Sequence, residues 1–314
     1  MKVVILKLMY WVILLSLIMI KRTIIITTPC YLSVKNRQLQ IEKKDKPIQF
    51  TPIDDIGFLV LDNRQITLSM PLMNTLRENN TAVIFCDILH HPRSMMLNLD
   101  GNTIQNELFK AQIATSEPLK KNLWQQSIQA KINNQAAVLN YVGSDGKDLV
   151  SIARQVKSGD SDNREGYAAR LYWPRLFGYD FRRLREGLPP NNMLNYGYAI
   201  IRAAVARALA GSGLLNTLGI HHRNRYNAFC LADDIMEAYR PFVDAVVYEL
   251  NAAFPDSDDL TKEMKMELLS VLSCDCKMGE ETRPLMLAMQ ATSASLAQCF
   301  KGDKRKIDLP EFIE

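Results

Sequence analysis

The sequence predicts a two-domain α+β protein, with a small, mostly antiparallel β domain followed by a larger, all-α C-terminal domain. Short β-rich runs separated by turn residues recur about every ten residues up to residue 87, as is typical of a small sheet domain. After the turn at residues 100–102, the spacing of apolar residues becomes helical and stays so. Strands followed by helices indicate segregated domains rather than alternating βα units. We therefore expect domains at residues 19–100 and 101–314.

Short strands are predicted in the first domain wherever β-branched and other apolar residues cluster. Turn residues such as Asn36, Pro47 and Asp62 separate the clusters. The predicted strands are residues 24–26, 31–34, 39–41, 56–61, 66–68 and 82–85.

Helices are predicted in the second domain from the period of the apolar residues. The clearest covers residues 119–139, where Leu123, Ile128 and Ile132 belong to a stripe that faces the core. Pro241 cannot continue a helix without losing a hydrogen bond, so a helix should kink or restart there. The other predicted helices are residues 165–177, 195–210, 224–239, 260–272 and 283–300.

Composition excludes several protein classes. Hydrophobic residues make up 47% of the 314 residues and charged residues 23%, which excludes a disordered, collagen-like or coiled-coil chain. The formal net charge is only +4, so a nucleic-acid partner would require locally concentrated positive charge. The six cysteines form no C-x-x-C pair, and no histidine lies near Cys274 and Cys276, which argues against a zinc knuckle. Scattered cysteines indicate a reduced, cytoplasmic protein.

The N-terminus conflicts with a cytoplasmic location. Residues 8–20 form an apolar run flanked by Lys7 and Lys21. The run is shorter than the about 20 residues of a membrane span, and no small-residue cleavage site follows it. It is an uncleaved anchor, a degenerate signal peptide, or part of an upstream extension before a true start at Met19. We favour the extension, covering residues 1–18, because Met19 begins a short basic segment that leads into a β-branched strand, and we expect no membrane association.

Acidic residues and histidines cluster in one segment of the second domain. Asp234 and Glu237 are three positions apart, so on a helix they share a face with Asp233 close by. His221 and His222 lie just upstream. Two carboxylates and an imidazole make most of a divalent-metal site, and such donors favour Mg²⁺ or Mn²⁺. The alternative is an ordinary solvated helix face.

Two neighbouring observations leave the metal interpretation open. Arg240 lies three residues after Glu237 and can form an ion pair with it. Glu165 begins a predicted helix at the end of a polar loop, and a first-turn glutamate can simply stabilise the helix dipole.

Three ordered groups of segments together resemble the CRISPR-associated integrase family that acquires spacers (Cas-one), in the version found in type II systems. The similarity extends essentially from Met19 to Glu314. Family members combine an N-terminal β domain with a C-terminal α domain and have no N-terminal membrane segment. The segments are REGYAARLYW at 164–173 with LFG at 176–178, NMLNYGY at 192–198, and GIHHR at 219–223 with DDIME at 233–237 and YRPFVD at 239–244.

The resemblance implies a metal site formed by Glu165, His222 and Glu237, which would hold Mg²⁺ or Mn²⁺, with Asp234 in a supporting role. Between the two adjacent histidines, the family's spacing to the last acidic ligand favours His222 over His221. Many relatives have Asp at that last position, whereas this chain has Glu237.

The implied activity is that of a metal-dependent DNA endonuclease and integrase. It inserts short foreign DNA fragments into a CRISPR array by 3′-hydroxyl transesterification, as part of antiviral defence. The implied partners are double-stranded DNA (the incoming fragment and the CRISPR repeat), a second copy of the chain in a homodimer, and a small ferredoxin-like CRISPR-associated subunit. Arg164, Arg223 and Arg225 are candidates for phosphate contacts, or ordinary surface charges.

Two alternative functions remain at this point. One is a metal-dependent, structure-specific DNA nuclease that cuts without integrating. The other is a membrane-tethered, non-catalytic DNA-binding scaffold, which depends only on the apolar run at residues 8–20.

Overall fold

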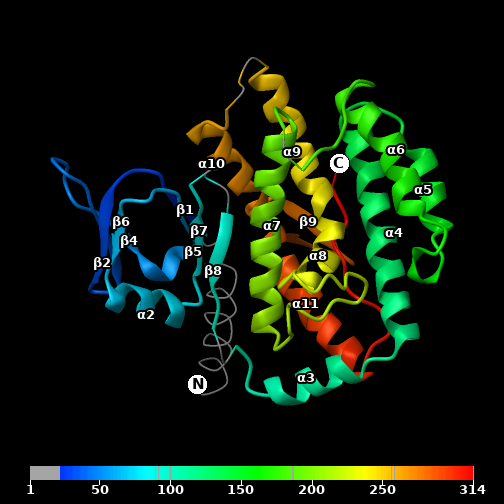
Figure 1. Ribbon diagram of the computed structural model, residues 1–314, viewed down its shortest axis with the longest axis horizontal. Helices are drawn as coiled ribbons and strands as arrows, with labels where there is room; N and C mark the ends of the chain where they lie inside the picture. The colour runs from blue at the N-terminus through cyan, green and yellow to red at the C-terminus, as the bar shows by residue number, and fades with distance from the viewer. Residues whose placement is uncertain are drawn as a thin grey trace, which may run out of the picture. The chain divides into compact units, whose positions relative to one another are not determined.

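The computed structural model describes residues 22–88, 90, 92–98, 101–185, 187–255, 257 and 259–313. The chain divides into two compact units, with the boundary between Met96 and Leu97. The first unit is rich in strands and the second in helices (Figure 1), which confirms the predicted fold class. The predicted extension at residues 1–18 and the apolar run behind the scaffold alternative lie outside the described residues.

The first unit contains two four-stranded sheets with strand orders β1-β5-β7-β8 and β4-β3-β2-β6. It also contains the helix α2 (Met70–Glu78) and the short turn η1 (Ile53–Asp55). The strands of the first sheet are β1 Arg22–Ile26, β5 Ile56–Leu61, β7 Ala82–Cys86 and β8 Pro92–Met96. The strands of the second are β4 Gln49–Pro52, β3 Gln38–Glu42, β2 Cys30–Lys35 and β6 Ile66–Leu68.

The prediction of a mostly antiparallel domain was wrong in its pairing. The pairs β1–β5, β5–β7 and β2–β6 are parallel, whereas β7–β8, β2–β3 and β3–β4 are antiparallel. Parallel neighbours need a long connection, and β6 with α2 supplies it between β5 and β7. The sequence analysis missed α2, whose N-cap Ser69 accepts a hydrogen bond from the Leu72 backbone N–H.

The second unit consists mainly of helices. Its helices are α3 Gln105–Ala114, α4 Glu117–Tyr141, α5 Lys147–Arg154, α6 Arg164–Phe177, α7 Asn191–Gly211, α8 Cys230–Ile235, α9 Arg240–Ala253, α10 Lys262–Ser270 and α11 Leu285–Lys301. Short 3-10 turns are η2 Ser158–Asp160, η3 Met236–Tyr239 and η4 Val271–Ser273. The unit is not all-α, because the strands β9 Asp275–Met278 and β10 Glu281–Pro284 form an antiparallel hairpin.

Helix α4 is the element that organises the site. It lies beside α5 and α6 (Figure 1) and packs against both of them, and also against α9 and η3. It buries the predicted stripe of Leu123, Ile128 and Ile132. Its buried Asn134 donates hydrogen bonds to the carbonyl oxygens of Ala238 (2.8 Å) and Pro310 (3.0 Å). The first of these bonds ties η3 to α4.

The predicted single helix over residues 224–239 is instead a loop followed by α8 and η3. In the loop before α8, a side chain accepts a hydrogen bond from a backbone N–H group that would bond to a backbone carbonyl in a helix. The Phe229 backbone N–H donates to the side chain of Asn227 (2.9 Å), which favours a turn over an earlier helix start. A new helix, α9, then begins at Arg240, with Pro241 in its first turn as predicted.

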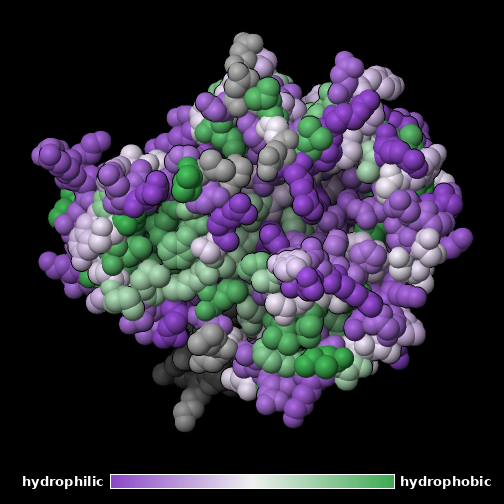
Figure 2. Space-filling view, viewed as in Figure 1, coloured by the Kyte–Doolittle hydropathy of each residue, from purple (hydrophilic) through white to green (hydrophobic). Residues whose placement is uncertain are grey.

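The outer surface of α5 and α6 is largely hydrophilic (Figure 2), whereas Leu149, Ile152 and Leu176 of these helices are buried. This arrangement is typical of amphipathic helices that cover a core. Among the described residues, no helix is both long enough and apolar enough to cross a membrane.

Candidate active site

Two of the predicted metal ligands come together on a lysine. The Lys131 ammonium of α4 lies 2.5 Å from the Glu165 carboxylate of α6 and 2.6 Å from the Glu237 carboxylate of η3. The side chains of Lys131 and Glu237 are only 11% and 7% exposed, while that of Glu165 is 30% exposed. Two glutamates that are far apart in the sequence therefore converge on a single cation.

The N-terminus of α6 holds Glu165 in place. The Asp160 carboxylate accepts hydrogen bonds from the backbone N–H groups of Arg164 (2.8 Å) and Glu165 (3.1 Å). Asn163 caps the helix by accepting from the Gly166 backbone N–H (3.1 Å). These contacts satisfy amides that have no partner within the helix, and so they fix its first turn.

Glu237 is held by two cations. Lys131 contacts one carboxylate oxygen, and the Arg240 guanidinium donates to the other at 2.9 Å. Burial by itself raises the pKa of the Glu237 carboxyl, but the charges of Arg240 and Lys131 outweigh burial and lower the pKa to about 2. Glu237 is therefore a carboxylate at neutral pH, and the ion pair with Arg240 considered from the sequence is present.

The Asp234 carboxylate organises the loop that carries His221 and His222, which we call the histidine loop. Asp234 is fully buried and accepts hydrogen bonds from the backbone N–H groups of Ile220 (2.7 Å), His221 (3.0 Å) and His222 (3.1 Å). One Asp234 oxygen also lies 2.6 Å from Nδ1 of the His222 ring. The bond to Asp234 outweighs burial and raises the pKa of His222. A carboxylate bound to Nδ1 leaves Nε2 as the ring nitrogen available to a ligand.

Gly219 makes this loop possible. A Cβ atom at this position would lie 2.6 Å from an Asp234 carboxylate oxygen and 2.5 Å from the carbonyl oxygen of His222. Both distances are shorter than a carbon atom permits. The close approach of backbone and carboxylate therefore requires glycine.

The two adjacent histidines have different surroundings. The His221 ring stacks on Trp124 of α4, with ring centroids 4.1 Å apart and an interplanar angle of 2°. The His222 ring is nearly perpendicular to that of His221, at 89°. Trp124 therefore stacks on His221 and meets the His222 ring edge-on, while Asp234 binds the ring nitrogen of His222 alone.

The donors present fit a divalent cation. Among the described residues, no three His, Cys, Asp or Glu side chains form a ready-made metal cluster. However, Glu165 and Glu237 already converge on one cation, and Asp234 leaves the His222 Nε2 available. Carboxylate oxygens with one imidazole nitrogen are a donor set suited to Mg²⁺ or Mn²⁺.

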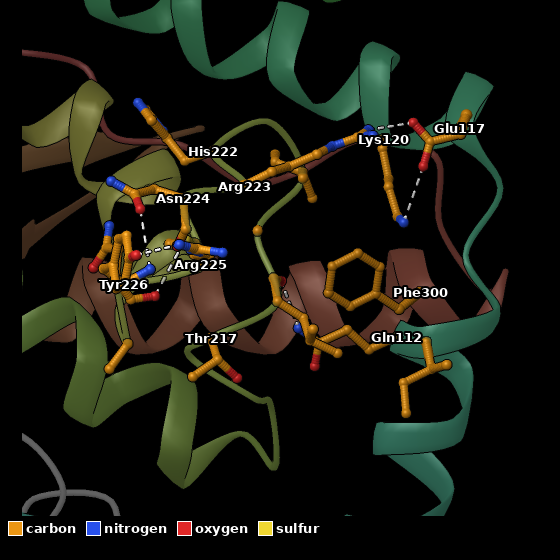
Figure 3. A pocket seen from close by; sticks show the side chains of 17 residues that line it. Gln112, Glu117, Lys120, Thr217, His222, Arg223, Asn224, Arg225, Tyr226 and Phe300 are labelled. Carbon is orange, nitrogen blue, oxygen red and sulfur yellow. Dashed lines mark hydrogen bonds and ion pairs between the residues drawn. The ribbon is translucent and has the colours of Figure 1, made fainter.

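A cavity of about 620 Å³ adjoins His222, and two of the three predicted DNA-contacting arginines line it (Figure 3). Arg223 forms an ion pair with Glu117, which also accepts from Lys120 (3.2 Å). The Arg225 guanidinium lies 4.6 Å from the Tyr226 ring centroid. Basic and aromatic groups of this kind suit a nucleic-acid strand.

The third arginine does not line this cavity. Arg164 begins α6 beside Glu165, and its guanidinium donates to Asp162 at 3.1 Å.

A family profile described as "CRISPR associated protein Cas1" matches residues 23–271. The chain belongs to the Cas1 family. This result confirms the resemblance that the three groups of sequence segments indicated.

One known Cas1 protein and two solved structures resemble the chain over more than nine-tenths of its length. The "CRISPR-associated endonuclease Cas1" of Neisseria meningitidis serogroup C (strain 8013) is 35% identical over 296 residues, which is 93% of this chain and 96% of that protein. A solved casposase bound to integration product is 20% identical with a TM-score of 0.75, covering 91% of this chain and 92% of that one. A Cas6-RT-Cas1–Cas2 complex is 17% identical with a TM-score of 0.69, covering 94% and 36%.

Sequence reasoning missed several residues of this candidate site. Lys131, Trp124 and Asp160 were not among the candidates, although each contacts a candidate or its backbone. One signal was available for Lys131. It lies seven residues after Trp124 and three after Ile128, which places it on the same side of α4 as these buried residues.

A second acid of this Cas1 chain lies in the core close to the site. Asp244 accepts hydrogen bonds from the hydroxyls of Tyr172 (3.0 Å) and Tyr198. Burial raises the pKa of Asp244 to about 6, more than its tyrosine and arginine neighbours lower it. Arg240 links this group to the site, since its guanidinium lies 4.5 Å from the Tyr198 ring centroid and also contacts Glu237.

We expect Asp244→Asn to stabilise the protein at about pH 8 and much less at about pH 4.5. A raised folded pKa means that Asp244 favours the fold below its ordinary pKa of 3.8 and loses this contribution as the pH rises through about 6. The full shift corresponds to about 3 kcal/mol. Urea unfolding of both proteins at several pH values measures the difference, and a difference that does not change with pH would contradict the raised pKa.

Proposed function

We propose that the chain is a CRISPR-associated DNA endonuclease and integrase, which inserts short DNA fragments into a CRISPR array by 3′-hydroxyl transesterification. The observation that carries this proposal is the convergence of Glu165 and Glu237 on one cation, in a chain of the Cas1 family where Asp234 orients His222 and the charge of Glu237 also acts on that imidazole. The Neisseria relative, which is named an endonuclease, also supports it.

Glu165, Glu237 and the His222 Nε2 would hold Mg²⁺ or Mn²⁺. The bound ion would supply activation of the 3′-hydroxyl and neutralisation of charge on the reacting phosphate. Asp234 holds the His222 ring, and Asp160 holds the backbone of Glu165. In the reaction, a new bond forms between the 3′-oxygen of the fragment and a phosphorus of the repeat, while the bond from that phosphorus to the 3′-oxygen of the adjoining nucleotide breaks. The attacking hydroxyl loses a proton, and the leaving 3′-oxygen gains one. No serine, tyrosine or cysteine nucleophile is required.

The proposed partners are double-stranded DNA, a second copy of the chain and a small ferredoxin-like subunit. A casposase bound to integration product and a complex that joins Cas1 to Cas2 support a DNA substrate and such a subunit. Arg223 and Arg225 at the cavity, and Arg164 beside Glu165, are proposed to contact phosphates.

The nuclease that cuts without integrating remains the second candidate, because the same carboxylates serve hydrolysis. Water would replace the 3′-hydroxyl as the attacking group. A joined product on a plasmid that carries a CRISPR repeat supports integration, whereas cutting without joining supports the nuclease.

The proposal is tested by comparing the two histidines. His222→Ala should lose strand joining and Mn²⁺ binding, since His222 is the histidine oriented by Asp234. His221→Phe should keep most of both, because a phenyl ring can replace the stack on Trp124. Joining is measured on a repeat-containing plasmid, and Mn²⁺ binding by titration calorimetry. If His221→Phe loses the metal while His222→Ala keeps it, the assignment is wrong by one residue.

We expect DNA affinity to fall linearly with salt on a double-logarithmic plot, despite the small net charge of the chain. Arg223→Ala or Arg225→Ala should weaken binding and reduce the slope by about 0.9 for each lost phosphate contact. Arg283→Ala, on the β10 strand, is the control, since Arg283 does not line the cavity. Fluorescence anisotropy at several salt concentrations gives the slopes. Equal slopes for all four proteins would remove both arginines from the DNA interface.

A further inference from the structure

Lys131 occupies the space where the two proposed ligands meet. Its ammonium contacts the Glu165 and Glu237 carboxylates at 2.5 and 2.6 Å, from the middle of the long helix α4. Its side chain is 11% exposed, so little water screens the ammonium from the two carboxylates. Mg²⁺ takes carboxylate oxygens at about 2.0–2.1 Å, so an ion shared by the same two oxygens would need nearly the same space as the ammonium.

The local charges also set the Lys131 ammonium against a divalent cation at this position. Without a metal ion, Lys131 and Arg240 balance Glu165 and Glu237. A divalent cation added to this neutral group would meet an ammonium at short range, where repulsion in a poorly solvated site is strong. Removing the Lys131 charge would leave an anionic group, with the two carboxylates directed at one point. Arg240 contacts the other oxygen of Glu237 and does not occupy that point.

We propose that Lys131 is an internal cation that competes with the divalent metal, holding Glu165 and Glu237 together in the metal-free protein and leaving their shared position when the ion binds. This inference rests on the proposed function, because it takes those glutamates as metal ligands. Lys131 thereby sets the metal concentration at which the site fills. It is a positioning residue.

The flexible side chain of lysine suits this role. Four methylene groups carry the ammonium, so the charge can move away while the backbone of α4 stays fixed. Arginine at this position would hold a carboxylate through two parallel hydrogen bonds and would be harder to displace.

The test is the binding of Mn²⁺ alone to metal-free protein, measured by titration calorimetry and by the electron paramagnetic resonance signal of free Mn²⁺. Lys131→Met and Lys131→Gln both remove the charge, and the glutamine keeps a hydrogen-bond donor in case the methionine variant does not fold. Each variant should bind Mn²⁺ at least about tenfold more tightly than the wild type. Lys301→Met is the matched control, since Lys301 also pairs with a glutamate, Glu107, but lies on α11 and does not line the cavity. Its Mn²⁺ affinity should equal that of the wild type.

The outcomes separate this inference from the proposed function. If the wild type binds Mn²⁺ and Glu165→Gln abolishes binding, Glu165 is a ligand. The Lys131 variants then test only whether Lys131 competes with the metal. Unchanged or weaker Mn²⁺ binding in those variants would then overturn it. If the wild type and the Lys131 variants all fail to bind Mn²⁺, both the metal site and the inference are wrong.

Discussion

Glu165→Gln is expected to reduce strand joining by on the order of 10³-fold or more while the fold remains intact. The amide has nearly the same shape as the carboxylate but lacks the charge that a divalent ion requires. Stability should change little, because the Glu165 side chain is 30% exposed and Lys131 keeps Glu237 as its partner. The measurement is the yield of joined product on a repeat-containing plasmid, together with Mn²⁺ binding.

The matched control for this substitution is Glu249→Gln, an exposed glutamate on α9. It removes the same charge from the same helical unit and should leave joining unchanged. Near wild-type joining by Glu165→Gln would show that Glu165 is not a metal ligand, and equal losses in both variants would indicate a general effect of charge.

Glu237→Ala is expected to destabilise the protein by about 3–5 kcal/mol, in contrast to Glu165→Gln. Glu237 is 7% exposed and pairs with both Lys131 and Arg240, so its loss leaves two largely buried cations without this carboxylate. Breaking a buried ion pair is costly because the remaining charge stays desolvated. Chemical denaturation of the metal-free protein measures the change.

A double substitution tests the cause of that loss. Lys131→Met combined with Glu237→Ala removes one of the two stranded cations and should be more stable than Glu237→Ala alone. If the second substitution adds a further loss of stability instead, the destabilisation comes from lost packing rather than from unpaired charge.

A helix or strand could be predicted where its own residues show a clear periodic pattern. The long helices α4, α6 and α7 were predicted because their apolar residues repeat over several turns. The edge strands β4 and β8 were missed, since each contains a proline and β4 exposes most of its residues. Parallel pairing in the first unit depends on contacts between distant segments, which local spacing does not report.

The site was predictable only where residue types carried a signal. Glu165, His222 and Glu237 were chosen from the family resemblance, and their role as ligands stays a prediction. The structure adds their surroundings, such as the Lys131 ammonium between the glutamates. A lysine within an amphipathic helix normally indicates a solvated face, so only the packing of α6 and η3 against α4 gives Lys131 its contacts.

The contact of Asp234 with the histidine loop lowers the side-chain entropy that His222 would lose on binding a ligand. A single carboxylate oxygen lies within hydrogen-bond distance of both the backbone nitrogen and the ring Nδ1 of His222, so the main chain and imidazole of that residue share one anchor. Immobilising a free side chain costs about 0.5–1.5 kcal/mol when a ligand binds. Here the rotamer is selected as the chain folds, so an ion bound at the proposed site would find the imidazole already ordered.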